Sequence, residues 1–377
     1  MAQQYVFSAP GRTEICGNHT DHQRGAVLAA AVNLETVAQV TRNDADVIRI
    51  DSQGYAPVEV SLADLSVKPE EKNSTAALVR GVAARFTQLG AEIHGFDAKV
   101  QSTVLPGSGL SSSAAFEVLM GTICNELFCN GQFSPVEVAQ IGQYAENVYF
   151  GKPCGLMDQT ASSVGNLVFI DFENPAAPLV EKIDFDFSQA GHALCIIDTG
   201  ADHADLTDEY AAIPGELKQI CAHFGKDVLR QIPEGEFFAA LPALRHKVPD
   251  RAILRAIHFY QENKRVFRQV QALKAGDFDT FLAITKESGR SSWMYLQNIT
   301  PAGAVAHQDV GVTLALCDTL LQGKGAFRVH GGGFAGTVQA FVPTEMLDTF
   351  RSGIEAVLGA GSCHVLQIRP QGGIRVN

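Results

Sequence analysis

The sequence predicts an α+β protein of two lobes, and three observations lead to this fold class. Its 377 residues exceed the ~100–200 residues of a usual domain, so about two domains are expected. A content of 46% hydrophobic and 19% charged residues can bury a large core and is unlike that of a disordered chain. Strand-like segments lead the first half, whereas helical periodicity dominates from about residue 205 to 323.

The elements of the first half follow from short-range patterns. Residues 26–50 alternate between apolar and polar side chains in two stretches, AVLAAAVNL and TVAQVTRN, which predict two strands. Residues 76–89 place apolar side chains on one helical face and end at a glycine, which predicts a helix. Alternation over 96–104 predicts a strand that leads directly into a helix over 114–128.

Later elements carry clearer boundary signals. Ser134, followed by Pro135 and then Glu137, has the spacing of a capping box and predicts a helix that runs to about residue 149. Residues 166–172 and 193–199 are predicted strands. After the helical region, AFRV and TVQAFV predict two strands around a tight glycine turn.

Composition excludes some classes of function. Lys and Arg number 29 against 41 Asp and Glu, and the resulting net charge of −12 disfavours nonspecific binding to nucleic acid or to anionic membranes. The N-terminal segment has no signal-peptide pattern, and no apolar run has the length of a membrane span. The eight cysteines are scattered without a CxxC pair, so free thiols and a cytoplasmic location are expected.

The junction after the 96–104 strand is the strongest candidate for a binding site. It reads LPGSGLSSSAA, in which Gly107 and Gly109 let the backbone turn sharply and approach a ligand. The start of the next helix offers unpaired N–H groups to a phosphate, and Ser111, Ser112 and Ser113 add hydroxyl groups. The alternative is a glycine turn with a serine N-cap, and spacing alone leaves both open because the lysine of a GxxxxGKS/T loop is absent.

A second candidate is GRTEICGNHTDHQRGA, residues 11–26, which crowds polar side chains between apolar flanks. Such a segment is typical of a loop that binds a polar ligand, and a solvated loop is the alternative. A metal site made by His19, Asp21 and His22 is less favoured, because side chains so close in sequence rarely bind one ion together.

Three other features have a structural and a functional interpretation. In GLMDQTASSVG, residues 155–165, Asp158 can serve as a general base or as a helix N-cap, and the cap is favoured. The segment RVHGGGFAGTVQAFV, residues 328–342, is interpreted as a hairpin turn. Glu146 on the preceding helix is interpreted as a surface carboxylate rather than as a metal ligand.

Taken together and in order, these segments resemble the galactokinase branch of the GHMP small-molecule kinases. GRTEICGNHTDHQRG is similar to the family's sugar segment, LPGSGLSSSAA to its phosphate loop, PCGLMDQ to the segment of its catalytic aspartate, and HGGGFAG to its third glycine motif. The resemblance implies a ribosomal protein S5 domain 2-like N-terminal lobe over 1–195 and a ferredoxin-like C-terminal lobe over 196–377. A last strand within 363–377 is expected to return to the first lobe.

The resemblance also implies roles for individual residues. Asp158 would act on the sugar O1 hydroxyl, and Arg12 would stabilise the transferred phosphoryl group. Ser113 and Glu146 would lie next to Mg²⁺, which prefers oxygen ligands. The other matched residues would hold the ATP phosphates, through Gly107, Gly109, Ser111, Ser112 and Ser113, and the sugar, through Asn18, His19, Asp21, Gly155 and Tyr210.

The chain departs from the family pattern at two ligand sites. Asn18 stands where galactokinases usually have Glu in G-E-H-T-D, and His22 stands where they have Tyr. Since that Glu contacts the sugar O6, we hypothesise that specificity at C6 is relaxed or altered, toward galacturonate or a sugar without the hydroxymethyl group. Near the adenine site, Thr75 and Leu78 precede Gly81 in place of the family's aromatic residues, so ATP is inferred rather than indicated directly.

The resulting prediction is an ATP-dependent sugar 1-kinase that uses Mg²⁺ and has galactose as its default substrate. The alternatives are a kinase for a C6-altered galactose relative, a catalytically silent sugar sensor, and a kinase for another small alcohol. The sensor is disfavoured because Arg12, Asp158 and the serine-rich loop are all present. No nucleic-acid or membrane partner is expected, and the predicted state is a monomer or a weak homo-oligomer.

Overall fold

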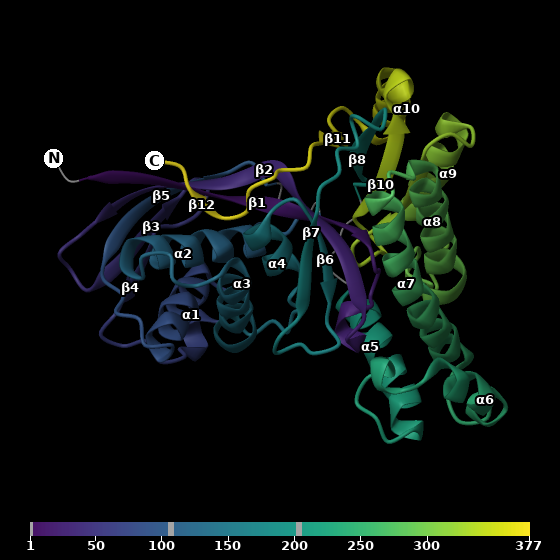
Figure 1. The fold of residues 1–377 in the computed structure, drawn as a ribbon, viewed down its shortest axis with the longest axis horizontal. Coiled ribbons are helices and arrows are strands. Elements are labelled where there is room, and N and C mark those ends of the chain that lie inside the picture. Colours follow the sequence, from purple (N-terminus) through teal and green to yellow (C-terminus); the bar gives the residue numbers. More distant parts are fainter. Residues whose placement is uncertain (1–2, 105–108, 201–205) are drawn as a thin grey trace.

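The chain forms two β-sheets that are each covered by helices (Figure 1). The computed structural model describes residues 3–104, 109–200 and 206–377. The larger sheet lies at the end of the molecule that holds both termini, and the smaller sheet lies at the other end among the later helices. The α+β class predicted from the sequence is therefore confirmed.

The larger sheet has eight strands in the described residues, and most neighbours are antiparallel. Its main path runs β12-β1-β2-β5-β3-β4, with β3 parallel to β5, and β6 joins β2 to β7 at the side. The strands are β1 (Gln4–Cys16), β2 (Ala26–Arg42), β3 (Val47–Ser52), β4 (Val58–Ser61), β5 (Phe96–Ser102), β6 (Leu167–Asp171), β7 (Leu179–Ile183) and β12 (Ile374–Arg375).

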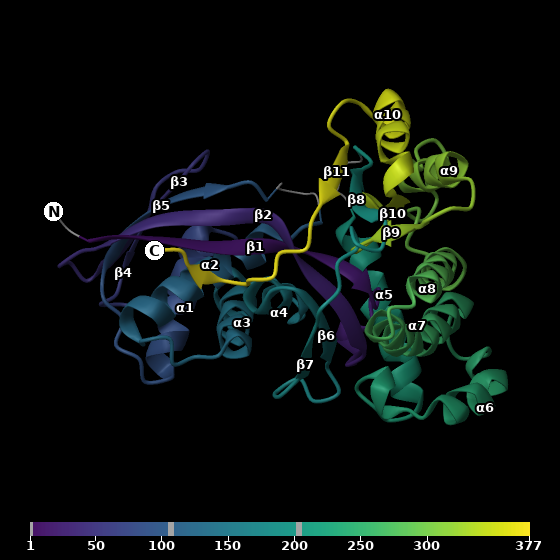
Figure 2. The same cartoon turned by 45° about the horizontal axis from the view of Figure 1, so that its top comes forward.

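Four helices cover one face of this sheet (Figures 1 and 2). Alternate residues of β5, such as Phe96, Ala98 and Val100, are buried against them, as the alternation over 96–104 predicts. The predicted capping box is present, since Ser134 and Glu137 each bond the other's backbone N–H. The helices are α1 (Thr75–Gln88), α2 (Ser112–Phe128), α3 (Pro135–Tyr144), which a π-helix η3 (Ala145–Phe150) extends, and α4 (Met157–Val164).

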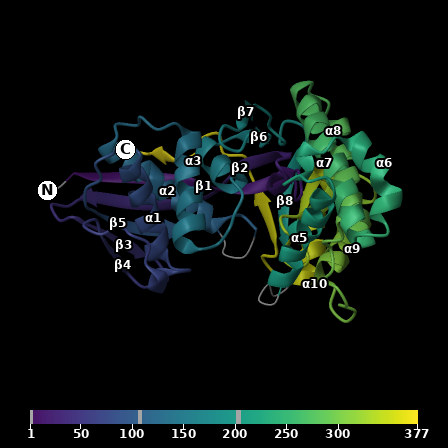
Figure 3. The ribbon, with the colours of Figure 1, turned by 90° about the horizontal axis from the view of Figure 1, so that it is seen from below.

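The smaller sheet has the order β11-β8-β10-β9 and is antiparallel throughout. Helices α7 and α8 lie beside it, and α9 and α10 lie at its far side (Figure 3). The strands are β8 (His192–Asp198), β9 (Ala326–His330), β10 (Thr337–Pro343) and β11 (Cys363–Leu366). The helices are α5 (Thr207–His223), α6 (Glu234–Leu244), α7 (Asp250–Lys274), α8 (Phe278–Ser291) with a π-helix η5 (Ser292–Leu296), α9 (Asp309–Leu321) and α10 (Leu347–Leu358).

Two details differ from the sequence prediction or refine it. Residues 26–42 form one long strand, β2, rather than two. The chain passes from one sheet to the other between 183 and 192, slightly before the predicted lobe boundary at 195. The C-terminal segment uses both sheets, because β11 pairs with β8 and β12 pairs with β1. In the described part of the chain, no helix combines the length and apolarity needed to cross a membrane.

Candidate functional site

The site is built around an ion pair between Arg12 and Asp158. Arg12 lies on β1, where the pairing with β2 is irregular on either side of the arginine, and such bulges re-aim side chains. Its Nε and Nη2 atoms each donate to one oxygen of Asp158, both at 2.7 Å. The arginine side chain is 9% exposed and the aspartate side chain 33% exposed. The pair therefore has one buried partner and one that solvent or a ligand can reach.

The surroundings keep Asp158 ionised. Burial by itself raises the pKa of the carboxyl group, but the charge of Arg12 and hydrogen bonds from Arg12 and Ser111 outweigh it and hold the pKa below its ordinary value. Asp158 is the second residue of α4, and Leu156 occupies the N-cap position without a side-chain cap bond. The favoured interpretation of Asp158 as a helix cap is therefore wrong, and its carboxylate faces the arginine instead.

The glycine–serine junction meets this ion pair. Ser111 precedes α2 with a left-handed backbone (φ 55°), and its hydroxyl donates to Asp158 rather than capping the helix. Arg12 also donates to the carbonyl of Gly109. Ser112 and Ser113 are half-buried first residues of α2. Ser111 thus occupies the N-cap position of α2 without a side-chain capping bond. Gly107 lies outside the described residues.

The sugar segment folds as a tight loop between β1 and β2. His19 has a left-handed backbone (φ 58°), and its Nε2 lies 3.1 Å from the carbonyl oxygen of Gly332. Burial lowers the pKa of His19 to about 4, so the ring is neutral near pH 7. Tyr210 of α5 donates to Gly333 O at 3.0 Å, and a Cβ on Gly332 would lie 2.5 Å from the tyrosine ring. His19 and Tyr210 thus meet at one glycine turn.

Asp21 lies on the other side of this loop, beside the segment that carries Asp158. A Cβ on Gly155 would lie 2.2 Å from Asp21 Oδ2, so any larger residue there would displace the Asp21 carboxylate. Burial raises the pKa of Asp21, and the charge of Asp158 adds to the effect, although the backbone N–H of His22 opposes it. Asp21, Gly155 and Asp158, which are far apart in sequence, therefore belong to one site.

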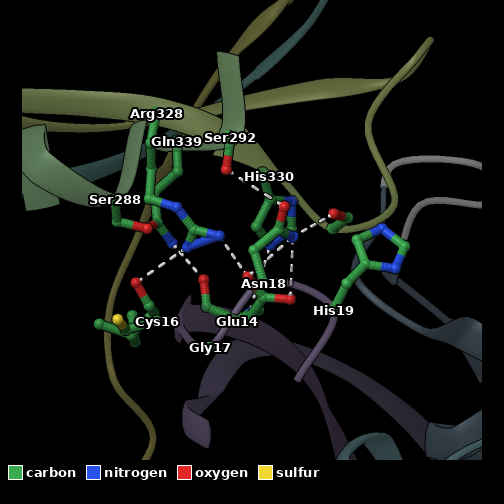
Figure 4. Close-up of polar contacts among 12 residues, drawn as sticks. Glu14, Cys16, Gly17, Asn18, His19, Ser288, Ser292, Arg328, His330 and Gln339 are labelled. Carbon is green, nitrogen blue, oxygen red and sulfur yellow. Dashed lines mark hydrogen bonds and ion pairs between the residues drawn. The ribbon is translucent and has the colours of Figure 1, made fainter. Parts of the chain in front are cut away.

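Asn18 is the predicted sugar contact that the structure places differently. Its side chain is fully buried, and Figure 4 shows it close to Glu14 and Ser292. Its amide nitrogen donates to Gly331 O at 2.6 Å and to Glu14, and its amide oxygen accepts from Asn298 at 2.9 Å. Both ends of the amide are thus bonded to protein groups, and Asn18 connects the loop to the third glycine motif instead of being open to a ligand.

Two residues of α7 hold the same loop and were not expected from the sequence. Glu262, which is fully buried, accepts backbone N–H groups from Gly17 at 3.2 Å and from Asn18 at 3.4 Å. His258, one turn earlier, contacts the carbonyl oxygen of Asn18 at 2.9 Å. Burial raises the pKa of Glu262, but the nearby positive charges, that of Arg265 first, and a hydrogen bond from Ser288 together outweigh it, so the pKa lies below its ordinary value.

A second buried pair joins β1 to the smaller sheet. Arg328 of β9 is fully buried, forms an ion pair with Glu14, and donates to Ile15 O at 3.0 Å (Figure 4). His330 lies 3.0 Å from the hydroxyl of Thr13. Burial raises the pKa of Glu14 to about 7, against the opposing charge of Arg328. The end of β1 is therefore fixed by groups from both sheets.

Glu146 lies in a buried acidic cluster behind α4. It is 4% exposed, so its interpretation as a surface carboxylate is wrong. The amide nitrogen of Gln159 lies 2.9 Å from Glu146 and 2.9 Å from Glu117, which is also buried. Burial, reinforced by the charge of Glu146, raises the pKa of Glu117 well above its ordinary value.

Among the described residues, no three His, Cys, Asp or Glu side chains gather as a metal site, so the less favoured site at His19, Asp21 and His22 is not formed.

Comparison with known proteins supports the family assignment. Residues 1–42 match the galactokinase galactose-binding signature, and residues 77–166 match the GHMP kinases N terminal domain. The chain is 32% identical over 98% of its length to a galactokinase of Streptomyces coelicolor, covering 93% of that protein. It is 31% identical to a galactokinase of Glaesserella parasuis, covering 93% of this chain and 88% of that one.

The chain belongs to the galactokinase family. The fold agrees, because a crystal structure of Lactococcus lactis galactokinase complexed with galactose superposes with a TM-score of 0.83 at 24% identity, covering 99% of this chain and 95% of that one. Membership of this family makes the chain a GHMP kinase that transfers a phosphoryl group to an alcohol.

The residues that the sequence did not reveal lie on α7, which packs against the sugar loop. Helix α7 buries five polar side chains together with its apolar ones. Their spacing of three or four residues places them on one helical face, which was the signal available in the sequence. They are Arg255, His258, Glu262, Arg265 and Gln269.

Proposed function

We propose that this protein is an ATP-dependent galactose 1-kinase. One observation carries the proposal: the Arg12–Asp158 pair contacts the serine-rich start of α2 and lies beside the loop that carries Asp21. A phosphate loop on one side and a polar loop on the other are the surroundings that phosphoryl transfer to a sugar hydroxyl requires.

Asp158 is the acceptor for the sugar hydroxyl. Because its pKa is held below the ordinary value, it is a carboxylate at neutral pH and can orient or deprotonate the C1 hydroxyl. Arg12 presents a fixed guanidinium beside it and can stabilise negative charge on the transferring phosphoryl group. Since Arg12 is buried and held by Gly109 and Asp158, little reorientation is needed when the substrates bind.

The residues around α2 fit a nucleotide with Mg²⁺. The first N–H groups of a long helix suit phosphate oxygens, and the hydroxyls of Ser111, Ser112 and Ser113 lie at that end. Mg²⁺ usually binds through one or two carboxylates together with substrate phosphates, which matches one buried carboxylate, Glu146, and the Ser113 hydroxyl. When bound, the ion would neutralise charge on the phosphates.

The sugar is proposed to lie against His19, Asp21, Gly155 and Tyr210. Asn18 supports this loop from behind, because its amide is already bonded at both ends. A C6-altered substrate is therefore not favoured over galactose. The cytoplasmic location and the monomeric or weakly oligomeric state stay predictions of the sequence.

Release of ADP from Mg-ATP by the purified protein tests the proposal, with galactose, galacturonate, arabinose and glucose as acceptors. We expect turnover with galactose and its loss in Asp158→Asn, which keeps the size of the side chain but removes the charge. As a control, Asp186→Asn makes the same substitution at an exposed carboxylate on the loop before β8, and it should leave turnover unchanged. Binding of galactose without turnover would support the sensor instead, and turnover of galacturonate alone would restore the C6 hypothesis.

A further inference from the structure

A cavity of about 610 Å³ opens at the edge of the smaller sheet formed by β9, between α8 and α9. Its walls come from α8, η5, α9, β9 and the turn before β9, and none of its lining residues is a predicted nucleotide, sugar or metal ligand. The volume falls in the range of ~300–1,000 Å³ that is usual for small-molecule sites. We call this cavity the basic pocket.

The basic pocket has an apolar and aromatic wall. Trp293 and Met294 lie in the π-helix η5 and are 51% and 58% exposed, whereas Ser292 and Leu296 of the same turn are buried. The π-helix thus turns two large apolar side chains outward, and such segments are frequent at functional sites. A Cβ on Gly311 would lie 3.7 Å from the indole ring, so the ring leans toward α9 across the opening.

Four cationic side chains line the same cavity, in a chain whose net charge is −12, and one of them, Arg328, is buried and paired with Glu14. Lys286 donates to Gly323 O at 2.9 Å. Arg290 and Lys324 are exposed, and within residues 3–104, 109–200 and 206–377 neither side chain has an ion pair or a hydrogen bond. Asp318 is the one acidic side chain among the described lining residues. Two exposed cationic side chains without a side-chain partner thus lie beside an exposed indole.

We propose that the basic pocket binds a small anion that carries a flat ring, at a site separate from those for the nucleotide and the sugar. The ring would lie against Trp293 and Met294, because flat apolar groups pack well on an indole. A phosphate or carboxylate on the ring would lie between Arg290 and Lys324, whose charges it would pair. The ring alone would contact only the apolar wall, and the anionic group alone would contact only the two cations.

The chain contains a single tryptophan, so fluorine-labelled tryptophan gives one NMR signal, and that signal reports the basic pocket. Naphthyl phosphate and naphthoate are the probes, and they distinguish a phosphate from a carboxylate as the preferred anion. We expect a saturable shift of the signal with at least one probe. Inorganic phosphate alone and naphthol alone should bind more weakly than the better probe.

The double variant Arg290→Gln, Lys324→Gln should weaken the better probe about tenfold, since each exposed ion pair contributes modestly. The matched control Lys226→Gln, Lys247→Gln removes the same charge from exposed positions elsewhere and should leave the affinity unchanged. Absence of a saturable shift with both probes, or equal affinity in the double variant and the native chain, would overturn the proposal. Because the readout is binding rather than turnover, the result does not depend on the proposed kinase activity.

Discussion

Replacement of Arg12 separates its two proposed effects, on the phosphoryl group and on Asp158. Arg12→Lys keeps the charge but replaces two N–H···O contacts of 2.7 Å with a single ammonium group. Loss of one hydrogen bond between charged groups costs about 1.5–3 kcal/mol, which corresponds to roughly a 10–100-fold fall in kcat/KM. Arg12→Ala removes the charge altogether and should lower kcat on the order of 10³-fold.

The pH dependence gives an independent readout. Burial raises the pKa of Asp158, and Arg12 is the largest cause that lowers it, so the pKa must rise when the arginine is removed. Less of the enzyme then carries the carboxylate at a given acidic pH. The acid limb of kcat/KM, which reports the free enzyme, should therefore move to higher pH in Arg12→Ala and less far in Arg12→Lys.

Steady-state ADP release across acidic and neutral pH measures both effects. Arg80→Lys is a matched control, because Arg80 contacts both oxygens of Glu71 at 2.8 and 2.6 Å with similar geometry but on α1. That variant should leave kcat and the acid limb unchanged. An acid limb in Arg12→Ala that stays in place or moves to lower pH would refute the reasoning, as would a fall in kcat of less than about tenfold.

Three further predictions follow from the buried groups and from the basic pocket. Gln159→Leu removes the donor that lies 2.9 Å from both Glu117 and Glu146, and it should raise the Mg²⁺ concentration for half-maximal activity by about tenfold, an effect that unchanged Mg²⁺ dependence would contradict. Because the pKa of Glu14 rises to about 7 on folding, the folded state binds a proton more tightly than the unfolded state, so this group lowers stability as pH rises from about 4.5 to about 7. Glu14→Gln should remove that part of the slope in urea titrations at several pH values, whereas an unaltered slope would count against it. Finally, the better naphthyl probe and galactose should change each other's dissociation constants by the same factor, since η5 contacts the sugar loop through Ser292; calorimetry in both orders checks this, and independent affinities would disprove it.

The sequence predicted elements whose signals are local. The capping box at Ser134 and the alternation in β5 depend on neighbours within a few residues, so they could be identified directly. The division of β2 into two strands failed because Asn33 and Glu35 look like an interruption. Their partners are distant, since Asn33 accepts from Gln367 and Glu35 pairs with Arg369, and these contacts let polar residues stay within one strand.

Site residues within recognisable motifs could be predicted from the sequence. Residues whose environment depends on burial by distant segments could not. Arg12, Ser111 and Asp158 come from three different motifs and lie together, although their roles toward ATP and the sugar stay proposals. Asn18 and Glu146 were assigned exposed or ligand-facing positions, but both are buried by segments that lie far away in the sequence or across a helix bundle. Short-range patterns carry no information about such distant partners. The one available signal was the row of polar residues along one face of α7.

The arrangement divides the work between the two sheets. Arg12, Asp158 and the serine-rich loop come from elements around the larger sheet, and they contact one another directly. The sugar loop starts from the same sheet, yet its backbone is held by Glu262 and His258 of α7. Changes in α7 should therefore act on the position of the sugar and leave the catalytic pair in place. We therefore propose that variants in α7 change sugar affinity more than the rate of phosphoryl transfer, because other contacts hold Arg12 and Asp158.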